Sequence, residues 1–156
     1  MPLNINNSEI SQVVDIWFGF HNPPPSMKTT FLRNHPILSN LHPRPFHSLD
    51  GRRYVNAEHA FQTWRTGKFN STVYLLNWEK CLSFHLGVSN NIDDLTRERS
   101  LLKRIICQSL IQNKDVLDYL LATGDRLITH RNERNPYWRR EFPAILMELR
   151  NEMRTI

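Results

Sequence analysis

The sequence has little cysteine and no long apolar run. Its 2 cysteines, Cys81 and Cys107, lie far apart, so they support neither a disulfide framework nor a cysteine metal cluster. No apolar run approaches the roughly 18 residues that cross a membrane, and the polar start over 1–11 lacks the basic and apolar regions of a secretion signal. We therefore expect a cytoplasmic protein.

Several common catalytic motifs are also missing. There is no G-x-G-x-x-G, no G-x-x-x-x-G-K-[ST] and no G-x-S-x-G, so the phosphate-binding loops and the serine hydrolase elbow lack their signatures. The 7 histidines do not show metal-ligand spacing in a helical context. We expect no metal and no cofactor. A catalytic role for Cys81 would need a neighbouring base that the sequence does not place.

The composition itself is that of a globular protein. The 156 residues are 40% hydrophobic and 22% charged, which suits one compact domain over 1–156, with 1–30 as an N-terminal extension packed on it. The formal net charge is +5 with an isoelectric point near 9.6, which favours an anionic partner.

The hydrophobic pattern predicts a mainly helical α+β domain with a small antiparallel sheet. Asp50-Gly51 between apolar residues indicates a hairpin, and Asn56 is a good cap for a helix that Gly67 should end. The spacing further predicts helices over 8–20, around 73–78, over 101–111, over 115–121 and at the C-terminus, and a strand over 126–129.

One polar stripe follows the Asn56 cap. At about 100° per residue, Glu58, Gln62 and Arg65 fall within roughly 60° of one another, beside an apolar face. A carboxylate, an amide and a permanent cation on one face are typical of a reactive site. A plain solvated face is the alternative for such a helix.

The residues in this region resemble those of a known family. The sequence reads Leu38-Ser39-Asn40-Leu41, then Pro43-Arg44-Pro45-Phe46, Asp50-Gly51-Arg52-Arg53-Tyr54 and Glu58-His59-Ala60-Phe61-Gln62, and it continues through Leu120-Leu121-Ala122-Thr123-Gly124-Asp125, Tyr137-Trp138 and Ile145-Leu146-Met147-Glu148-Leu149-Arg150. This order, over about 38–150, is similar to that of the NADAR superfamily and implies a NADAR-like fold.

The resemblance implies cleavage of an N-glycosidic bond without a cofactor. The leading expectation is hydrolysis of ADP-ribosylated guanine in DNA, which would reverse the action of a DNA-modifying toxin, as an antitoxin in a bacterium or as a counter-defence in a phage-infected cell. Two alternatives stay open: an N-glycosidase acting on phosphoribosyl intermediates of riboflavin synthesis, and a non-catalytic module that binds ADP-ribose or nucleic acid.

The resemblance also assigns roles to residues. Glu58 is the expected carboxylate for proton or charge work at the ribosyl C1. A lysine of the family falls on Arg65, which cannot act as an amine nucleophile, so Arg65 is expected to bind phosphate and Lys68 is a possible replacement. The expected substrate-binding residues are Asn40, Arg44, Arg52, Gln62, Asp125 and Trp138.

The match weakens around the expected Trp138. Family members often carry Asp three residues before this Trp and Gly directly after it, where this chain has Asn135 and Arg139. Part of the pocket rim is therefore expected to differ. An exposed Trp138 or Tyr137 could stack on a base, whereas a core position is the alternative.

Overall fold

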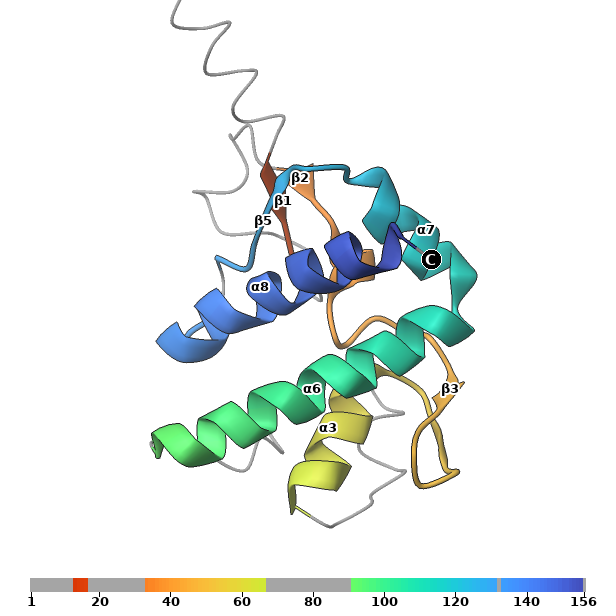
Figure 1. The fold of residues 1–156 in the computed structure, drawn as a ribbon, viewed down its shortest axis with the longest axis vertical. Coiled ribbons are helices and arrows are strands. Elements are labelled where there is room, and N and C mark those ends of the chain that lie inside the picture. Colours follow the sequence, from red (N-terminus) through yellow and green to blue (C-terminus); the bar gives the residue numbers. More distant parts are fainter. Residues whose placement is uncertain (1–12, 17–32, 67–90, 132, 156) are drawn as a thin grey trace, which may run out of the picture. The chain divides into compact units, whose positions relative to one another are not determined.

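The computed structural model describes residues 13–16, 33–66, 91–131 and 133–155 (Figure 1). The chain forms two compact units, one from residues 1–39 and 118–156 and one from residues 40–117. Among the described helices, none combines the length and the apolar character needed to cross a bilayer. The expectation of a single domain over 1–156 stays a prediction.

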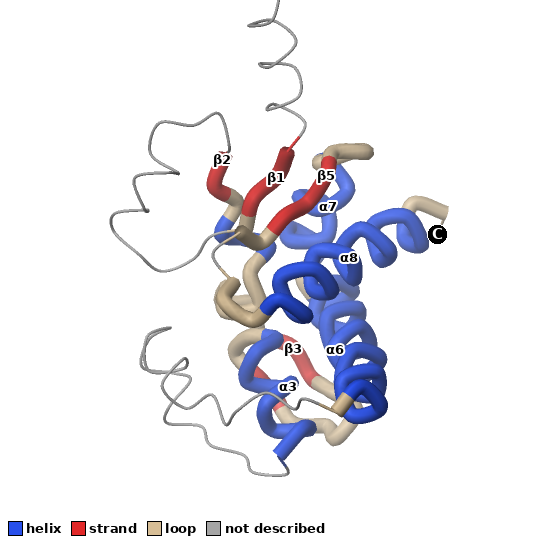
Figure 2. Tube along the Cα trace, turned by 90° about the vertical axis from the view of Figure 1, so that its left-hand side faces the viewer, coloured by secondary structure: helices blue, strands red, loops and turns tan. Residues whose placement is uncertain are grey.

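The first unit contains a three-stranded parallel sheet. Strand β1 (Val13–Asp15) lies between β2 (Arg33–Asn34) and β5 (Leu127–Thr129), as Figure 2 shows. Val14 pairs with Arg33 on one side and with Ile128 on the other. Parallel strands are normally covered on both faces, and the side chains of Val14 and Ile128 are buried accordingly.

The strand at 13–15 corrects a sequence-based prediction. The pattern predicted a helix over 8–20, and this is wrong at Val13–Asp15, while most of the remainder lies outside the described residues. Adjacent β-branched valines favour a strand, and pairing with two distant segments stabilises it. Only antiparallel pairing was expected, so this parallel sheet was missed. The predicted strand over 126–129 is confirmed as β5.

A long C-terminal helix packs on this sheet. Helix α8 (Pro136–Met153) begins with Pro136, and the Asn135 side chain caps it by accepting a hydrogen bond from the Trp138 N–H at 3.1 Å. It contacts β5. The short helix η1 (Pro36–Leu38) and the second half of α7 (Lys114–Ala122) also belong to this unit. Its core is apolar and comprises Val14, Ile16, Leu38, Leu120, Ile128, Trp138, Phe142, Ile145, Leu146, Leu149 and Met153.

The second unit begins with the predicted hairpin. Strands β3 (Phe46–His47) and β4 (Arg53–Tyr54) pair antiparallel, which confirms the small antiparallel sheet. Gly51 has a φ of 79°, a conformation that glycine adopts without strain. The Gln112 side chain also binds the hairpin, because it accepts from the His47 N–H and donates to the His47 carbonyl, each at 2.7 Å.

Two helices pack beside this hairpin. Helix α3 (Ala57–Thr66) follows the Asn56 cap, and α6 (Ile92–Gln112) carries the strong apolar stripe, so both predictions are confirmed. The predicted helix over 115–121 is α7 (Lys114–Ala122), whereas the one around 73–78 lies outside the described residues. The unit's core comprises Phe46, Tyr54, Ala57, Ala60, Phe61, Leu95, Leu102, Ile105, Ile106, Leu110 and Val116.

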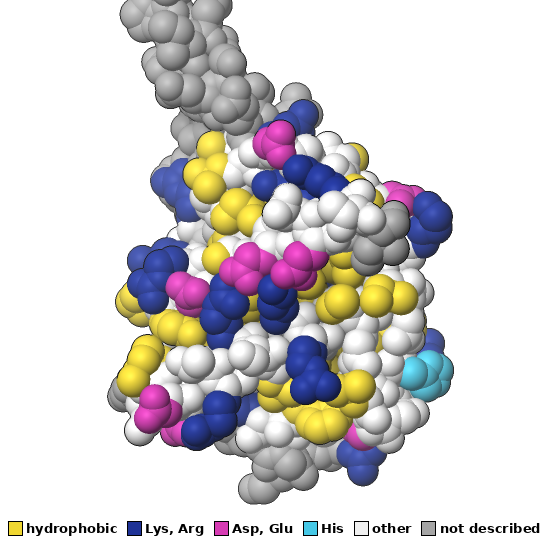
Figure 3. Space-filling view, in the orientation of Figure 1, with side chains coloured by type: hydrophobic (Ala, Val, Ile, Leu, Met, Phe, Trp, Pro, Cys, Tyr) yellow, Lys and Arg dark blue, Asp and Glu magenta, His cyan; other side chains and the backbone are white. Residues whose placement is uncertain are grey.

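The charged side chains are interspersed on the face that Figure 3 shows. Within each unit, Lys and Arg side chains on this face occur together with Asp and Glu side chains.

Candidate functional site

The start of α3 brings two predicted site residues together. The Asn56 side chain accepts a hydrogen bond from the His59 N–H at 2.7 Å, which fixes the first turn and places Glu58 in it. The Glu58 N–H donates to the Asn40 carbonyl at 3.1 Å. The segment around Asn40 therefore lies against the first turn that carries Glu58.

The predicted polar stripe on α3 is a hydrogen-bonded chain. Gln62 donates through Nε2 to Glu58 Oε1 at 2.8 Å. Arg65 donates to Gln62 Oε1 through Nε at 3.2 Å and through Nη2 at 2.9 Å. Glu58 is half-buried, and Gln62 is only 4% exposed. The alternative of a plain solvated face therefore does not describe these side chains.

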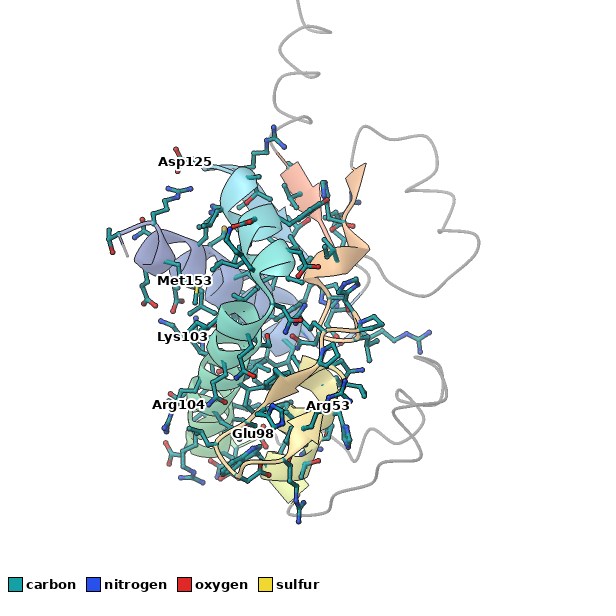
Figure 4. The ribbon with its side chains drawn as sticks, turned by 90° about the vertical axis from the view of Figure 1, so that its right-hand side faces the viewer. Arg53, Glu98, Lys103, Arg104, Asp125 and Met153 are labelled. Atoms are coloured by element: carbon teal, nitrogen blue, oxygen red, sulfur yellow. The ribbon has the colours of Figure 1, made fainter. Side chains whose placement is uncertain are left out.

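A fourth member of this chain comes from α6 and was missed by the sequence analysis. Glu98 Oε1 lies 3.7 Å from Arg65 Nη1, and the side chains of Arg65 and Glu98 are only 13% and 16% exposed. Helices α3 and α6 contact each other, and Figure 4 shows Glu98 where α6 runs beside α3. No motif indicates Glu98, because its relation to Arg65 arises only from helix packing.

Arg44 lies in the interior of its unit. It is 1% exposed, its Nε donates to Ser109 Oγ at 3.1 Å, and its N–H donates to the Val55 carbonyl at 2.8 Å. Burial lowers the pKa of Arg44 to about 10, and the charge of Asp115 opposes this shift. Burial, followed by the charge of Arg44, lowers the pKa of His42. The predicted substrate residue Arg44 is therefore an internal cation in this unit.

Arg52 is exposed on the hairpin turn. Its N–H donates to Asp50 Oδ1 at 3.0 Å, and Tyr54 Oη donates to Asp50 Oδ2 at 2.5 Å. Burial, with the hydrogen bond to Asp50, raises the pKa of Tyr54 to about 12. Asp50 thus organises the turn that presents Arg52.

The other two predicted residues lie in the first unit. Trp138 is only 9% exposed, so of the two positions that the sequence left open it takes the core one, and Tyr137 beside it is half-buried. Asp125 is exposed and forms an ion pair with Arg154 at 2.7 Å, whose hydrogen bond and charge lower the pKa of Asp125. Asp125 also borders an open hollow of about 470 Å³ on α8. Lys68 lies outside the described residues.

Among the described residues, no cluster of three or more His, Cys, Asp or Glu side chains could hold a metal ion.

The structure brings together Glu58, Gln62, Arg65 and Glu98, and the segment around Asn40 lies against the start of α3. This group offers a carboxylate acceptor held by an amide, and it contains the half-buried guanidinium of Arg65. Such a group can take up a proton or stabilise a positive charge on a ligand.

Comparison with known proteins identifies the fold. No protein-family model matches the chain, and no curated protein does. The structure is similar to the solved structure of the Escherichia coli protein YbiA, with a TM-score of 0.61, 15% sequence identity, and coverage of 92% of this chain and 85% of that one. YbiA is a NADAR-family protein, so the chain has a NADAR-like α+β fold.

Proposed function

We propose that the protein is an N-glycosidase that hydrolyses the bond between ADP-ribose and guanine in DNA, and so reverses DNA modification by a toxin. The observation that carries the proposal is the hydrogen-bonded group Glu58–Gln62–Arg65, which runs along α3 from its first turn to its last, in a fold shared with a NADAR-family protein. Because fold alone does not determine function, the proposal depends on what these side chains can do chemically.

Glu58 has the chemistry that this reaction requires. When the C1–N bond of the ribosyl group breaks, its electron pair goes to the guanine nitrogen, which takes up a proton, and positive charge develops on C1. A carboxylate beside C1 stabilises that charge. It also accepts the proton of the water molecule whose oxygen bonds to C1. The hydrogen bond from Gln62 to Glu58 Oε1 fixes the carboxylate for this work.

Two further features support an ADP-ribosyl substrate on DNA. The net charge of +5 favours a polyanion. In the described part of the chain, the buried Asn40 Oδ1 has no hydrogen-bond partner, and the Asn40 main-chain carbonyl accepts a hydrogen bond from the Glu58 N–H. An unsatisfied acceptor on the residue whose carbonyl meets the first turn of α3 suits a ribose hydroxyl.

The test is release of ADP-ribose from an oligonucleotide that carries ADP-ribosylated guanine. We expect the protein to release it, Glu58→Gln to lose at least about 100-fold in rate, and Glu152→Gln, an exposed glutamate on α8, to behave as the parent. Absence of release by the parent would refute the proposal, as would full activity of Glu58→Gln. A phosphoribosyl pyrimidine tests the small-molecule alternative, for which activity should fall less steeply with salt.

A non-catalytic binding module is the second candidate, and one observation favours it. Arg65 stands where the family resemblance places a lysine, and a guanidinium stays protonated and does not attack C1. On this alternative the parent binds the modified oligonucleotide without cleaving it. Turnover gained by Arg65→Lys over a silent parent would then support binding, whereas turnover by the parent excludes it.

A further inference from the structure

The chain of contacts on α3 has a direction. Arg65 places two donors, Nε and Nη2, on Gln62 Oε1. Gln62 then has only its Nε2 donors for Glu58, and it donates to Glu58 Oε1 at 2.8 Å. Since a primary amide has an acceptor end and a donor end, the guanidinium determines which end meets the carboxylate.

The reverse orientation of Gln62 is unfavourable. Turning the amide over would place its N–H donors against the Arg65 guanidinium and its oxygen against the Glu58 carboxylate. Both contacts are repulsive, and water has little access to relieve them because Gln62 is 4% exposed. The position of the guanidinium therefore decides how Glu58 is held.

Glu98 supports the guanidinium from the neighbouring helix. Its Oε1 lies 3.7 Å from Arg65 Nη1, on the remaining terminal nitrogen of the fork, and both side chains are largely shielded from water. A charge pair at this exposure is less screened than a surface pair. Glu98 thus restrains the Arg65 guanidinium at one end of this series of contacts, and Glu58 is at the other end.

We infer that Glu98 is a positioning residue for Glu58, which acts through Arg65 and Gln62. On this inference Arg65 orients the carboxylate, and its fork is engaged by protein groups rather than by a substrate phosphate. The inference rests on the proposed role of Glu58, but the arrangement of the side chains is measurable without any catalysis.

The activity test compares two carboxylates on α6. Glu98→Ala removes the support of Arg65, whereas Asp94→Ala removes the partner of the exposed Arg97 on the same helix. We expect Glu98→Ala to lower kcat about tenfold with KM nearly unchanged, and Asp94→Ala to lower neither. The effect should vanish in a Glu58→Gln background, because the two residues act as one unit. An additive loss in that background would overturn the inference, as would an equal loss in Asp94→Ala.

A conservative series separates positioning from structure. Arg65→Lys keeps the charge but lacks the planar fork that bonds Gln62 twice, so we expect it to recover only part of the kcat that Arg65→Met loses. Melting temperatures within a few degrees of the parent for these variants would show that folding is not the cause. A loss of kcat that simply follows a loss of melting temperature would count against positioning.

A spectroscopic test remains decisive even if no glycosidase activity is found. The side-chain amide resonances of Gln62 and the carboxyl ¹³C resonance of Glu58 report the contact directly in the free protein. We expect both to shift in Glu98→Ala and to stay unchanged in Asp94→Ala. If the parent is inactive and these shifts occur, the proposed function fails and the positioning survives; unchanged resonances in Glu98→Ala overturn the positioning itself.

Discussion

Arg150 of α8 and Arg65 of α3 have different sets of partners. Arg150 of α8 is 6% exposed and donates through Nη1 to Thr123 Oγ1 at 3.0 Å and to the Arg126 carbonyl at 2.8 Å. Arg65 of α3 donates to the side chain of Gln62 and pairs with Glu98. Arg150 holds the turn that carries Thr123 and Arg126, whereas Arg65 holds the side chains of Gln62 and Glu98.

This difference indicates a structural role for Arg150 and a role in activity for Arg65. A main-chain carbonyl is available at any position, so a bond to it restrains the fold whatever the neighbouring residues are. A bond to an amide that itself bonds a carboxylate restrains the orientation of a reactive group. We therefore expect Arg150 to control stability and Arg65 to control activity.

The largest effect on stability is expected for Arg150→Met. Methionine keeps much of the volume but leaves the Arg126 carbonyl and Thr123 without their donor, so we expect a loss of about 2–3 kcal/mol in the free energy of unfolding. Urea denaturation measures it. Arg139→Met is the matched control, because exposed Arg139 also donates to main-chain carbonyls, those of Glu133 and Arg134. Equal losses in both variants would break the comparison.

Arg65→Met should give the converse result. We expect a loss of stability of about 1 kcal/mol, since the hydrogen bonds of Arg65 to Gln62 go to one side-chain oxygen and its 3.7 Å separation from Glu98 is long for an ion pair. We also expect a drop in the rate of ADP-ribose release of about tenfold or more. Urea denaturation and the oligonucleotide assay on the same preparation measure the two effects. A large loss of stability with unchanged activity would show that Arg65, like Arg150, has a structural role and does not control activity.

The local parts of the fold could be predicted from the sequence. Asn56 and the apolar spacing after it predicted α3, and Asp50-Gly51 predicted the hairpin, because caps and turns depend on neighbouring residues. The strand at 13–15 was predicted as a helix. Its valines fit either period, and what decides between them is pairing with β5 at the other end of the chain.

The candidate site divides in the same way. Glu58, Gln62 and Arg65 were predicted on one face because helical spacing determines it. Glu98 was missed because packing of α6 on α3 brings it to Arg65. The interior position of Arg44 was also not foreseen, because the sequence around it is irregular and rich in proline, without a periodic pattern that indicates burial.

A smaller effect is expected at Asp15, which holds a turn as Arg150 does. Its Oδ1 accepts from Thr129 Oγ1 at 2.6 Å and from the Arg131 N–H at 3.1 Å, yet burial raises its pKa above 3.8. A raised pKa means that the folded state binds the proton more tightly, so the contribution of Asp15 to stability is present at low pH and is lost as the pH rises through the folded-state pKa.

Asp15→Asn isolates this dependence. Asparagine keeps the Oδ1 acceptor and does not titrate, so the melting temperature of the variant should rise relative to the parent between about pH 4 and pH 7. Thermal unfolding of both proteins across this range measures the difference. A constant difference, or a relative gain by the parent with increasing pH, contradicts the assignment.

The smallest effect is expected for Asp125→Asn. Asp125 is exposed, and its pKa is lowered by Arg154, so the carboxylate favours the folded state above its unfolded-state pKa and loses that contribution as the pH falls. Exposed pairs contribute little, and we expect no measurable change in the urea midpoint at neutral pH and moderate salt. Arg154→Ala should be more harmful, because Arg154 also donates to the Gly124 carbonyl. A larger loss in Asp125→Asn than in Arg154→Ala would contradict this. It would mean that a bond from an arginine to a main-chain carbonyl is not what stabilises the fold, and the expected difference between Arg150 and Arg65 would need another cause.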